Sequence, residues 1–125
     1  GIIDAPIGRS LKNRKKMAVT VEGKSREAIT HFKVLKRFPG YTLVEATLRT
    51  GRTHQIRVHL AFIGHPIVGD QLYGRKKQGI NISRQALHSH ILGFVHPSTK
   101  KYMEFCVPLP KDIQEIIDYL ERGEK

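Results

Sequence analysis

Residues 48–61 read Leu-Arg-Thr-Gly-Arg-Thr-His-Gln-Ile-Arg-Val-His-Leu-Ala, and within this stretch the apolar pattern changes its period. From Tyr41 to Arg49 apolar and polar residues alternate, which is typical of a strand with one polar face. From Thr53 to Ile63 the spacing is helical, with these apolar positions and a glycine stop signal: Ile56, Leu60, Ile63 and Gly64. The stretch predicts a strand, a basic polar loop and then a short amphipathic helix.

The rest of the chain predicts further strands and one more helix. Apolar and β-branched runs indicate strands at residues 17–21, 27–38, 89–95 and 101–107. The turn signal Pro39-Gly40 joins the second of them to the next strand as a hairpin. Pro110 opens a terminal helix with an isoleucine-rich face, and residues 74–83 have the composition of an exposed loop. No linker or repeat divides the chain, so we expect one α+β domain over residues 1–125, with a mixed, largely antiparallel sheet, a short central helix and a C-terminal helix.

The chain carries a net charge of +11, and this charge is unevenly distributed. Residues 1–60 contain 13 lysines and arginines against 4 carboxylates, whereas residues 101–125 contain 4 against 6. Basic side chains cluster at residues 9–16 and again at residues 75–77. Such clusters match a polyphosphate ligand, and nucleic acid is the leading partner on charge alone. A merely solvated basic face is the alternative, and charge does not distinguish RNA from DNA.

Other features limit the class of protein. No apolar run approaches the roughly 20 residues that span a bilayer, so we expect a soluble, cytoplasmic protein with no membrane partner. The single cysteine, Cys106, lies in an apolar run and is interpreted as a buried strand thiol. The histidines lack a familiar ligand spacing: His54 and His59 are five residues apart, and the pair His88 and His90 has no acidic or cysteine ligands nearby. We therefore expect no metal.

Two arginines of the central stretch are candidates for ligand contacts. On a helix, Arg57 points away from the expected core stripe of Ile56 and Leu60, so its guanidinium can be half-buried and face a cleft. Such an arginine suits a bidentate pair with a carboxylate or a phosphate. Arg52, in the loop before the helix, is better placed for phosphate. The simpler interpretation is a structural ion pair at Arg57 and a helix-capping role for His54.

The central stretch is similar to the G-R-x-H-Q-[IL]-R-x-H signature of the RluA/RluD family of RNA pseudouridine synthases. The similarity continues on both sides of it, through Pro6-Ile7-Gly8-Arg9, Thr30-His31-Phe32, Gly64-His65-Pro66, Gly69-Asp70, Gln85-Ala86-Leu87-His88, His96-Pro97 and Pro108-Leu109-Pro110. A long motif with several matched flanks is far more specific than a short glycine pattern. The resemblance covers nearly the whole chain and implies the C-terminal part of a pseudouridine synthase catalytic domain.

The resemblance also implies a chemistry. In that family a uridine is flipped out of the RNA and an aspartate attacks it, after which the uracil is rotated and reattached through carbon, without cofactor or metal. The position that matches the family's aspartate-pairing arginine is Arg57. The family's active-site tyrosine lies in an upstream segment, so neither Tyr41 nor Tyr73 is expected to have that role.

The sequence departs from the family at the nucleophile. The family's catalytic aspartate belongs to an H-R-L-D-x-x-T-S-G segment that these 125 residues lack. The aspartates that are present lie in other contexts: Asp4, Asp70, Asp112 and Asp118. Because the nucleophile is missing, we expect the chain to be inactive alone. It also begins at Gly1 without an initiator methionine or a leader, so we interpret it as a fragment or processed product.

We therefore expect a chain that supplies the basic half of the active site and an RNA-binding surface to an RNA-modifying enzyme. The expected substrate is structured RNA, in particular ribosomal RNA of the large subunit. Besides Arg57, the residues expected to contact RNA are Arg9, Lys12, Arg14, Lys15, Lys16, Arg52, His54, Gln55, Lys76 and Lys77. The sequence does not indicate an oligomeric state.

Two other functions remain open on the sequence. A non-catalytic RNA-binding or assembly module would use the same basic face, and an H-R-L-D segment upstream of Gly1 would decide against it. A DNA-binding domain fits less well, because zinc-finger spacing is absent and the helix from Thr53 to Ile63 is too apolar to lie exposed in a groove.

Overall fold

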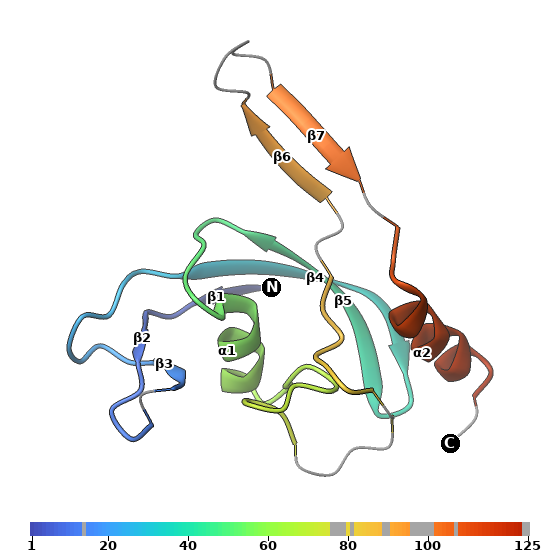
Figure 1. Cartoon of the computed structure of the whole chain (residues 1–125), viewed down its shortest axis with the longest axis horizontal. Helices are drawn as coiled ribbons and strands as arrows, with labels where there is room; N and C mark the ends of the chain where they lie inside the picture. The colour runs from blue at the N-terminus through green and yellow to red at the C-terminus, as the bar shows by residue number, and fades with distance from the viewer. Residues whose placement is uncertain are drawn as a thin grey trace.

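A long β-hairpin forms the centre of the computed structural model (Figure 1), which describes residues 1–13, 15–75, 80, 82–88, 91–95, 102–106 and 108–123. Its two strands, β4 (Ile29–Phe38) and β5 (Tyr41–Leu48), are antiparallel. Gly40 in the connecting turn has φ +78°, a conformation that glycine adopts after proline without strain. The hairpin predicted at Pro39-Gly40 is therefore confirmed.

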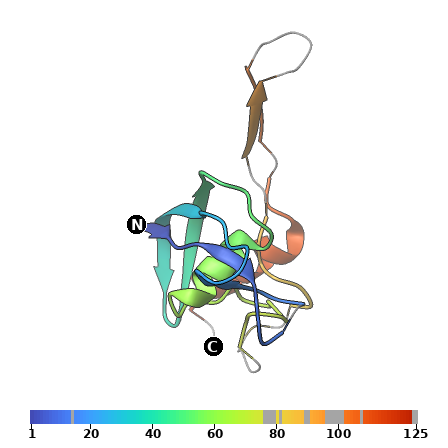
Figure 2. The same ribbon diagram turned by 90° about the vertical axis from the view of Figure 1, so that its left-hand side faces the viewer.

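Shorter strands extend and flank this hairpin. β1 (Ile2–Asp4) pairs antiparallel with β4, which gives a sheet of order β1-β4-β5. β2 (Ile7–Arg9) and β3 (Met17–Val19) form a second antiparallel hairpin. β6 (Ile91–Val95) and β7 (Tyr102–Cys106) form a third, which projects from the rest of the chain in Figures 1 and 2. The expected α+β class with a largely antiparallel sheet is confirmed.

Two helices pack beside these strands. α1 (Gln55–Phe62) lies against β3 and β4, and it is two residues shorter at its start and one shorter at its end than the predicted helix. Gly64, with φ +86°, ends it as expected: its N–H donates to the carbonyl of Ala61, and the N–H of His65 donates to that of Leu60. This pair of hydrogen bonds is the usual glycine-terminated helix end.

The buried face of α1 differs from the expected stripe. Val58 is buried against Ile7 and Ala28, and two polar side chains of α1, Gln55 and His59, are buried beside it. The residues predicted as the core stripe are half-buried or, for the last, 37% exposed: Ile56, Leu60 and Ile63. The prediction that this stripe forms the buried face of the helix was wrong. The helix instead buries Gln55 and His59, which costs little because their hydrogen bonds are satisfied.

The second helix, α2 (Lys111–Glu121), agrees with its prediction. Ile113 and Ile117 are buried on its inner face. Its first turn is held by Arg84, whose Nε and Nη2 lie 3.0 Å and 2.9 Å from the carboxylate oxygens of Asp112. No helix in the described part of the chain has the length and apolar character needed to cross a membrane.

Two expectations fall partly outside the described residues. Within the predicted loop 74–83, Ile80 is buried rather than exposed, and residues 76–79 and 81 are not among those described. Cys106 lies in β7 as expected, but the burial of its side chain is likewise outside what the structure describes.

Candidate functional site

Arg57 and Asp70 form the ion pair at the centre of the site. The Nε of Arg57 lies 2.8 Å from Oδ2 of Asp70, and its Nη2 lies 2.9 Å from Oδ1, which is a bidentate geometry. The side chain of Asp70 is fully buried, and that of Arg57 is 16% exposed. Oδ1 of Asp70 also accepts the backbone N–H groups of Leu72 at 3.0 Å and Tyr73 at 3.1 Å. The carboxylate is thus fixed by four hydrogen bonds and holds one edge of the guanidinium.

The turn that carries Asp70 depends on two glycines. Gly69 has φ +80°, and a Cβ at this position would overlap the carbonyl oxygen of Arg84. A Cβ on Gly74 would overlap the carbonyl oxygen of Asp70, which accepts the N–H of Gly74 at 2.9 Å. Only glycine fits at either end without a backbone shift. The sequence Gly69 to Gly74 therefore builds a fixed turn that places Asp70 under α1.

The two charges of the pair reinforce one another. Burial alone would raise the pKa of Asp70, but the hydrogen bonds from Arg57 and from two backbone N–H groups, with the arginine charge, hold that pKa below its ordinary value. The hydrogen bond to Asp70 is the main cause of a raised pKa at Arg57. Both groups are therefore charged at neutral pH.

The other edge of the Arg57 guanidinium is open. Nη1 makes no hydrogen bond to any residue in the described part of the chain, although a guanidinium offers five donor hydrogens. The predicted half-buried position of Arg57 is confirmed. The simpler interpretation of Arg57, a structural ion pair, also agrees with the structure, but its partner Asp70 was not identified from the sequence, which placed this aspartate in another context. The available signal was its position in the Gly69-Asp70 flank of the central motif.

The guanidinium of Arg57 also lies over the aromatic ring of Tyr73. The ring centroid is 5.1 Å from Cζ of the guanidinium, which is within the range of a cation–π contact. The hydroxyl of Tyr73 accepts the N–H of Met17 at 2.9 Å and lies 2.7 Å from Nδ1 of His54. Because the hydroxyl accepts from Met17, its own proton can be donated to Nδ1, which corresponds to a neutral His54 with its proton on Nε2.

His54 itself has an unusual backbone. Among the described residues it is the one non-glycine residue with positive φ, at φ 56° and ψ 23°, a conformation that costs about 1–2 kcal/mol. It occupies the N-cap position of α1, but its side chain makes no capping hydrogen bond, so the capping interpretation is not supported. Burial is the main cause that lowers the pKa of His54; the charge of Arg57 acts in the same direction and that of Asp70 opposes it.

Gln55 anchors the start of α1 to the sheet. Its Nε2 donates to the carbonyl of Ile29 at 2.9 Å and to Oγ1 of Thr30 at 3.0 Å. Its Oε1 accepts the hydroxyl of Thr50 at 2.7 Å and the N–H of Arg52 at 2.9 Å. The amide thus uses all four of its hydrogen-bonding positions, and the residue is 3% exposed. Gln55, expected to contact RNA, is placed in the scaffold instead, where its side chain is not available to a ligand.

The polar relay continues from Gln55 into the core. Oγ1 of Thr30 lies 2.8 Å from Nδ1 of His59, and Nε2 of His59 lies 2.8 Å from the carbonyl oxygen of Ala5. A carbonyl only accepts, so Nε2 of His59 carries a proton and donates it to Ala5. This relay of Gln55, Thr30 and His59 connects α1 with β4 and with the segment that leads into β2.

The basic loop, residues 10–16, joins β2 to β3 and reaches the site through Met17. It is closed by its own side chains: the N–H of Asn13 donates to Oγ of Ser10, and Oδ1 of Asn13 accepts the N–H of Lys15. Of the residues expected to contact RNA here, Arg9, Lys12 and Lys15 are exposed and Lys16 is half-buried. Arg14, Lys76 and Lys77 lie outside the described residues.

Arg52 lies in the loop before α1, as predicted. Its Nε donates to the carbonyl of Glu27 at 2.7 Å, which fixes the stem of the side chain against the segment before β4. Its Nη1 and Nη2 groups make no hydrogen bond within the part of the chain that the structure describes. Two donor groups are therefore available for an anion.

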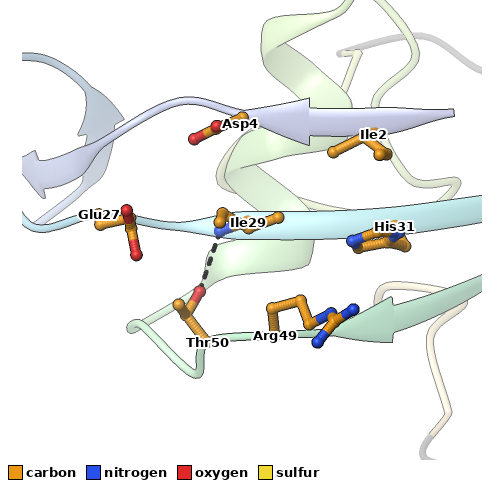
Figure 3. Close-up of a pocket in the computed structure, with 7 residues that line it drawn as sticks. All are labelled: Ile2, Asp4, Glu27, Ile29, His31, Arg49 and Thr50. Atoms are coloured by element: carbon orange, nitrogen blue, oxygen red, sulfur yellow. Dashed lines mark hydrogen bonds between the residues drawn. The ribbon is translucent and has the colours of Figure 1, made fainter.

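A shallow depression of about 500 Å³ lies on the other face of the β1-β4-β5 sheet from α1 (Figure 3). It is lined by Ile2, Asp4, Glu27, Ile29, His31, Arg49 and Thr50. Carboxylates and a guanidinium share this lining, so it does not favour a polyanion. Arg57 is not among the residues that line this depression, so we place the functional site at Arg57 and not in the depression. Among the described side chains, no group of three or more metal-ligating residues occurs.

Comparisons with known proteins agree on one family. The family model described as RNA pseudouridylate synthase matches residues 1–62, a range that ends with α1. An uncharacterized RNA pseudouridine synthase of Bacillus subtilis, YlyB, is 55% identical over 123 residues, covering 98% of this chain and 40% of that protein. The ribosomal large subunit pseudouridine synthase D of Zymomonas mobilis is 42% identical over 127 residues, covering 96% of this chain and 40% of that protein.

A solved structure supports the same fold. The human RNA pseudouridylate synthase domain containing 1 superposes with a TM-score of 0.70 at 25% identity, covering 100% of this chain and 60% of that one. The chain spans about two-fifths of the length of the curated relatives above.

Proposed function

Because the chain belongs to the RluA/RluD-type family of RNA pseudouridine synthases, we propose that it supplies one half of the active site of an enzyme that isomerises uridine to pseudouridine in structured RNA. The proposed substrate is large-subunit ribosomal RNA, the class that the name of the Zymomonas mobilis relative states. The reaction replaces an N-glycosidic bond by a C-glycosidic bond within one nucleotide. It is an isomerisation, so it requires no external electron donor or acceptor.

The observation that carries this proposal is the half-buried guanidinium of Arg57, held on one edge by Asp70 and open on the other. The family's nucleophilic aspartate is proposed to come from a segment outside these 125 residues and to bind the open Nη1 edge. There the arginine charge keeps that carboxylate ionised, and the planar donors set its direction. Asp70 already compensates much of the positive charge, so the nucleophile is oriented without being fully neutralised.

The surrounding groups are proposed to hold the RNA. Arg52 presents two free donor groups for a phosphate, and the basic loop at residues 10–16 adds a further set of exposed cations. His54 is proposed to be the neutral, Nε2-protonated tautomer, because its Nδ1 faces the hydroxyl of Tyr73 and burial lowers its pKa, and it then presents a single hydrogen-bond donor beside Arg57. The flipped base therefore meets a neutral donor, and the phosphates meet the cations.

The test uses the full-length enzyme and a large-subunit ribosomal RNA substrate at saturating enzyme. We expect pseudouridine formation by the full-length enzyme, and none by the 125-residue chain alone, because the nucleophile is missing from it. If an H-R-L-D segment is absent upstream of Gly1 and the full-length protein binds RNA without forming pseudouridine, the alternative of a non-catalytic RNA-binding module replaces this proposal.

A further inference from the structure

Tyr73 contacts three parts of the site that come from different elements. Its ring lies against the guanidinium of Arg57 on α1, and the ring of His54 stands edge-on to it with centroids 5.5 Å apart. Its hydroxyl accepts the N–H of Met17, the first residue of β3. The side chain of Tyr73 therefore connects α1, which carries Arg57, with the β2–β3 hairpin.

The ring of Tyr73 is itself held in place. It packs against the buried cluster of Ile7, Ala28 and Val58. Its backbone N–H donates to Asp70, so the turn that fixes the carboxylate also fixes the tyrosine. The hydroxyl is thus held in a fixed position relative to Arg57 and Asp70.

The basic loop is the neighbour that this hydroxyl contacts through Met17. Lys15 and Lys16 directly precede Met17, so the hydrogen bond from Met17 to Tyr73 lies at the point where the loop rejoins the sheet. β2 and β3 are strands of three residues each; Ile7, Met17 and Val19 attach them to the core, and the hydrogen bond to Tyr73 fixes the end of the loop itself. A loop that holds RNA must keep a set distance from Arg57 if the target nucleotide is to reach the reacting groups.

We propose that Tyr73 is a positioning residue: its hydroxyl ties the basic β2–β3 hairpin and His54 to the arginine of the active site, so that RNA held by the loop lies in register with Arg57. This inference rests on the proposed function. It assigns to Tyr73 a role that differs from the family's active-site tyrosine, because its hydroxyl is occupied by Met17 and His54 and its ring by Arg57.

The test replaces Tyr73 by Phe in the full-length enzyme, which keeps the ring against Arg57 and the core and removes only the hydroxyl. We expect the single-turnover rate constant at saturating enzyme to fall about tenfold, with RNA affinity changed less than about threefold. The matched control is Tyr41→Phe at the β4–β5 turn, since the hydroxyl of Tyr41 makes no hydrogen bond to the described residues. It should leave the rate constant unchanged.

A second measurement separates positioning from folding. A partly misfolded variant needs a higher enzyme concentration to reach saturation but keeps the parent's rate constant there, whereas misplacement of RNA lowers the rate constant at saturation itself. We also expect Lys15→Ala to lower the rate constant in the parent enzyme and to have a smaller effect on it in the Tyr73→Phe background, because the tie is already lost. A normal rate constant for Tyr73→Phe, or fully independent effects of the two substitutions, would overturn the inference. An inactive parent enzyme would overturn the proposed function instead.

Discussion

Arg57 and Asp70, 13 residues apart in the chain, meet in a bidentate ion pair that occupies the Nε and Nη2 groups of the arginine. In the proposed enzyme, the nucleophilic carboxylate therefore has only the Nη1 edge of the guanidinium to bind. Arg57 would thus pair with two carboxylates, Asp70 and the nucleophile. Loss of the first pair should lower the stability of the protein, and loss of the second should lower the rate constant.

Replacement of Arg57 in the full-length enzyme should impair chemistry more than RNA binding. Lys keeps the charge but lacks the planar fork, so it cannot pair bidentately with Asp70 while it orients the nucleophile. Ala leaves the nucleophile without its partner and with a raised pKa. We expect Arg57→Lys to lower the single-turnover rate constant by about 100-fold and Arg57→Ala by more, which corresponds to roughly 3 kcal/mol or above. Rapid-quench measurements at saturating enzyme give this rate constant separately from affinity.

Arg52→Ala is the matched comparison for these variants. Its free donors suit phosphate, so its loss should weaken RNA binding by several-fold and leave the rate constant at saturation close to that of the parent. If Arg57→Ala left the rate within a factor of a few while Arg52→Ala abolished it, the two arginines would have been assigned the wrong way round.

Asp70→Asn should destabilise the protein in a pH-dependent manner. The pKa of Asp70 is lower in the folded state than its ordinary value, so its stabilising contribution is complete above the unfolded-state pKa of about 3.9 and is lost as the pH falls through the lower folded-state value. At pH 7 we expect a loss of about 3 kcal/mol, because Arg57 is left without its buried partner. Urea unfolding at pH 7 and pH 3 measures the difference, which should shrink at the lower pH. Asp4→Asn, at an exposed position, is the control; an equal loss at both pH values would contradict the assignment.

Gln55→Leu should lower the free energy of unfolding of the protein without a direct effect on its contacts with RNA. The substitution removes four hydrogen bonds and leaves the carbonyl of Ile29, the hydroxyls of Thr30 and Thr50 and the N–H of Arg52 without this partner. We expect a loss of roughly 3 kcal/mol in the free energy of unfolding, measured by denaturant titration. A variant that keeps its stability but loses RNA affinity would return Gln55 to the RNA-binding surface.

RNA binding should weaken steeply with salt, because phosphate contacts dominate it. Each neutralised phosphate contributes roughly −0.9 for duplex or −0.7 for single-stranded RNA to the slope of log affinity against log salt. Lys12→Ala and Lys15→Ala should each make the slope shallower by about that amount in filter-binding titrations. Lys111→Ala on the acidic helix α2 should not change it. A salt response that is flat in the parent protein would remove the electrostatic argument.

His54 should titrate below its ordinary pKa. Burial and the charge of Arg57 lower the pKa of His54 in the folded state. The folded protein is therefore destabilised relative to the unfolded chain as the pH falls below the unfolded-state pKa of about 6.5. ¹⁵N chemical shifts should show the Nε2-protonated neutral ring at pH 7, hydrogen-bonded at Nδ1 to Tyr73. A midpoint above 6.5, or the opposite tautomer, would contradict this arrangement.

The sequence predicts those parts of the structure that local patterns determine. The β4–β5 hairpin and α2 follow from alternation, a Pro-Gly turn and helical spacing, all of which are short-range. The orientation of α1 could not be predicted in this way. Its buried face carries Gln55 and His59, whose burial depends on Thr30 and Ala5, more than 20 residues away. Hydrophobic periodicity contains no information about such partners.

For the candidate site, the sequence likewise predicts the positions of single residues but not their tertiary contacts. The exposure of Arg57 and the position of Arg52 follow from their places in the helix and the loop. The partner of Arg57 does not, since a turn between two glycines brings Asp70 back under the helix. The left-handed backbone at His54 was also missed, because no glycine signals it. Tertiary contacts hold that residue in a conformation that its side chain alone disfavours.

The relay of Gln55, Thr30 and His59 also constrains how this protein can evolve. Nε2 of Gln55 donates to Oγ1 of Thr30 and to the carbonyl of Ile29, and Nε2 of His59 donates to the carbonyl of Ala5. A change at one position leaves its neighbour with an unmatched proton or lone pair, and only a second, compensating change restores the match. We therefore expect these three positions to covary among relatives as one inherited unit, and variants with a single replacement to be rare intermediates between complete sets.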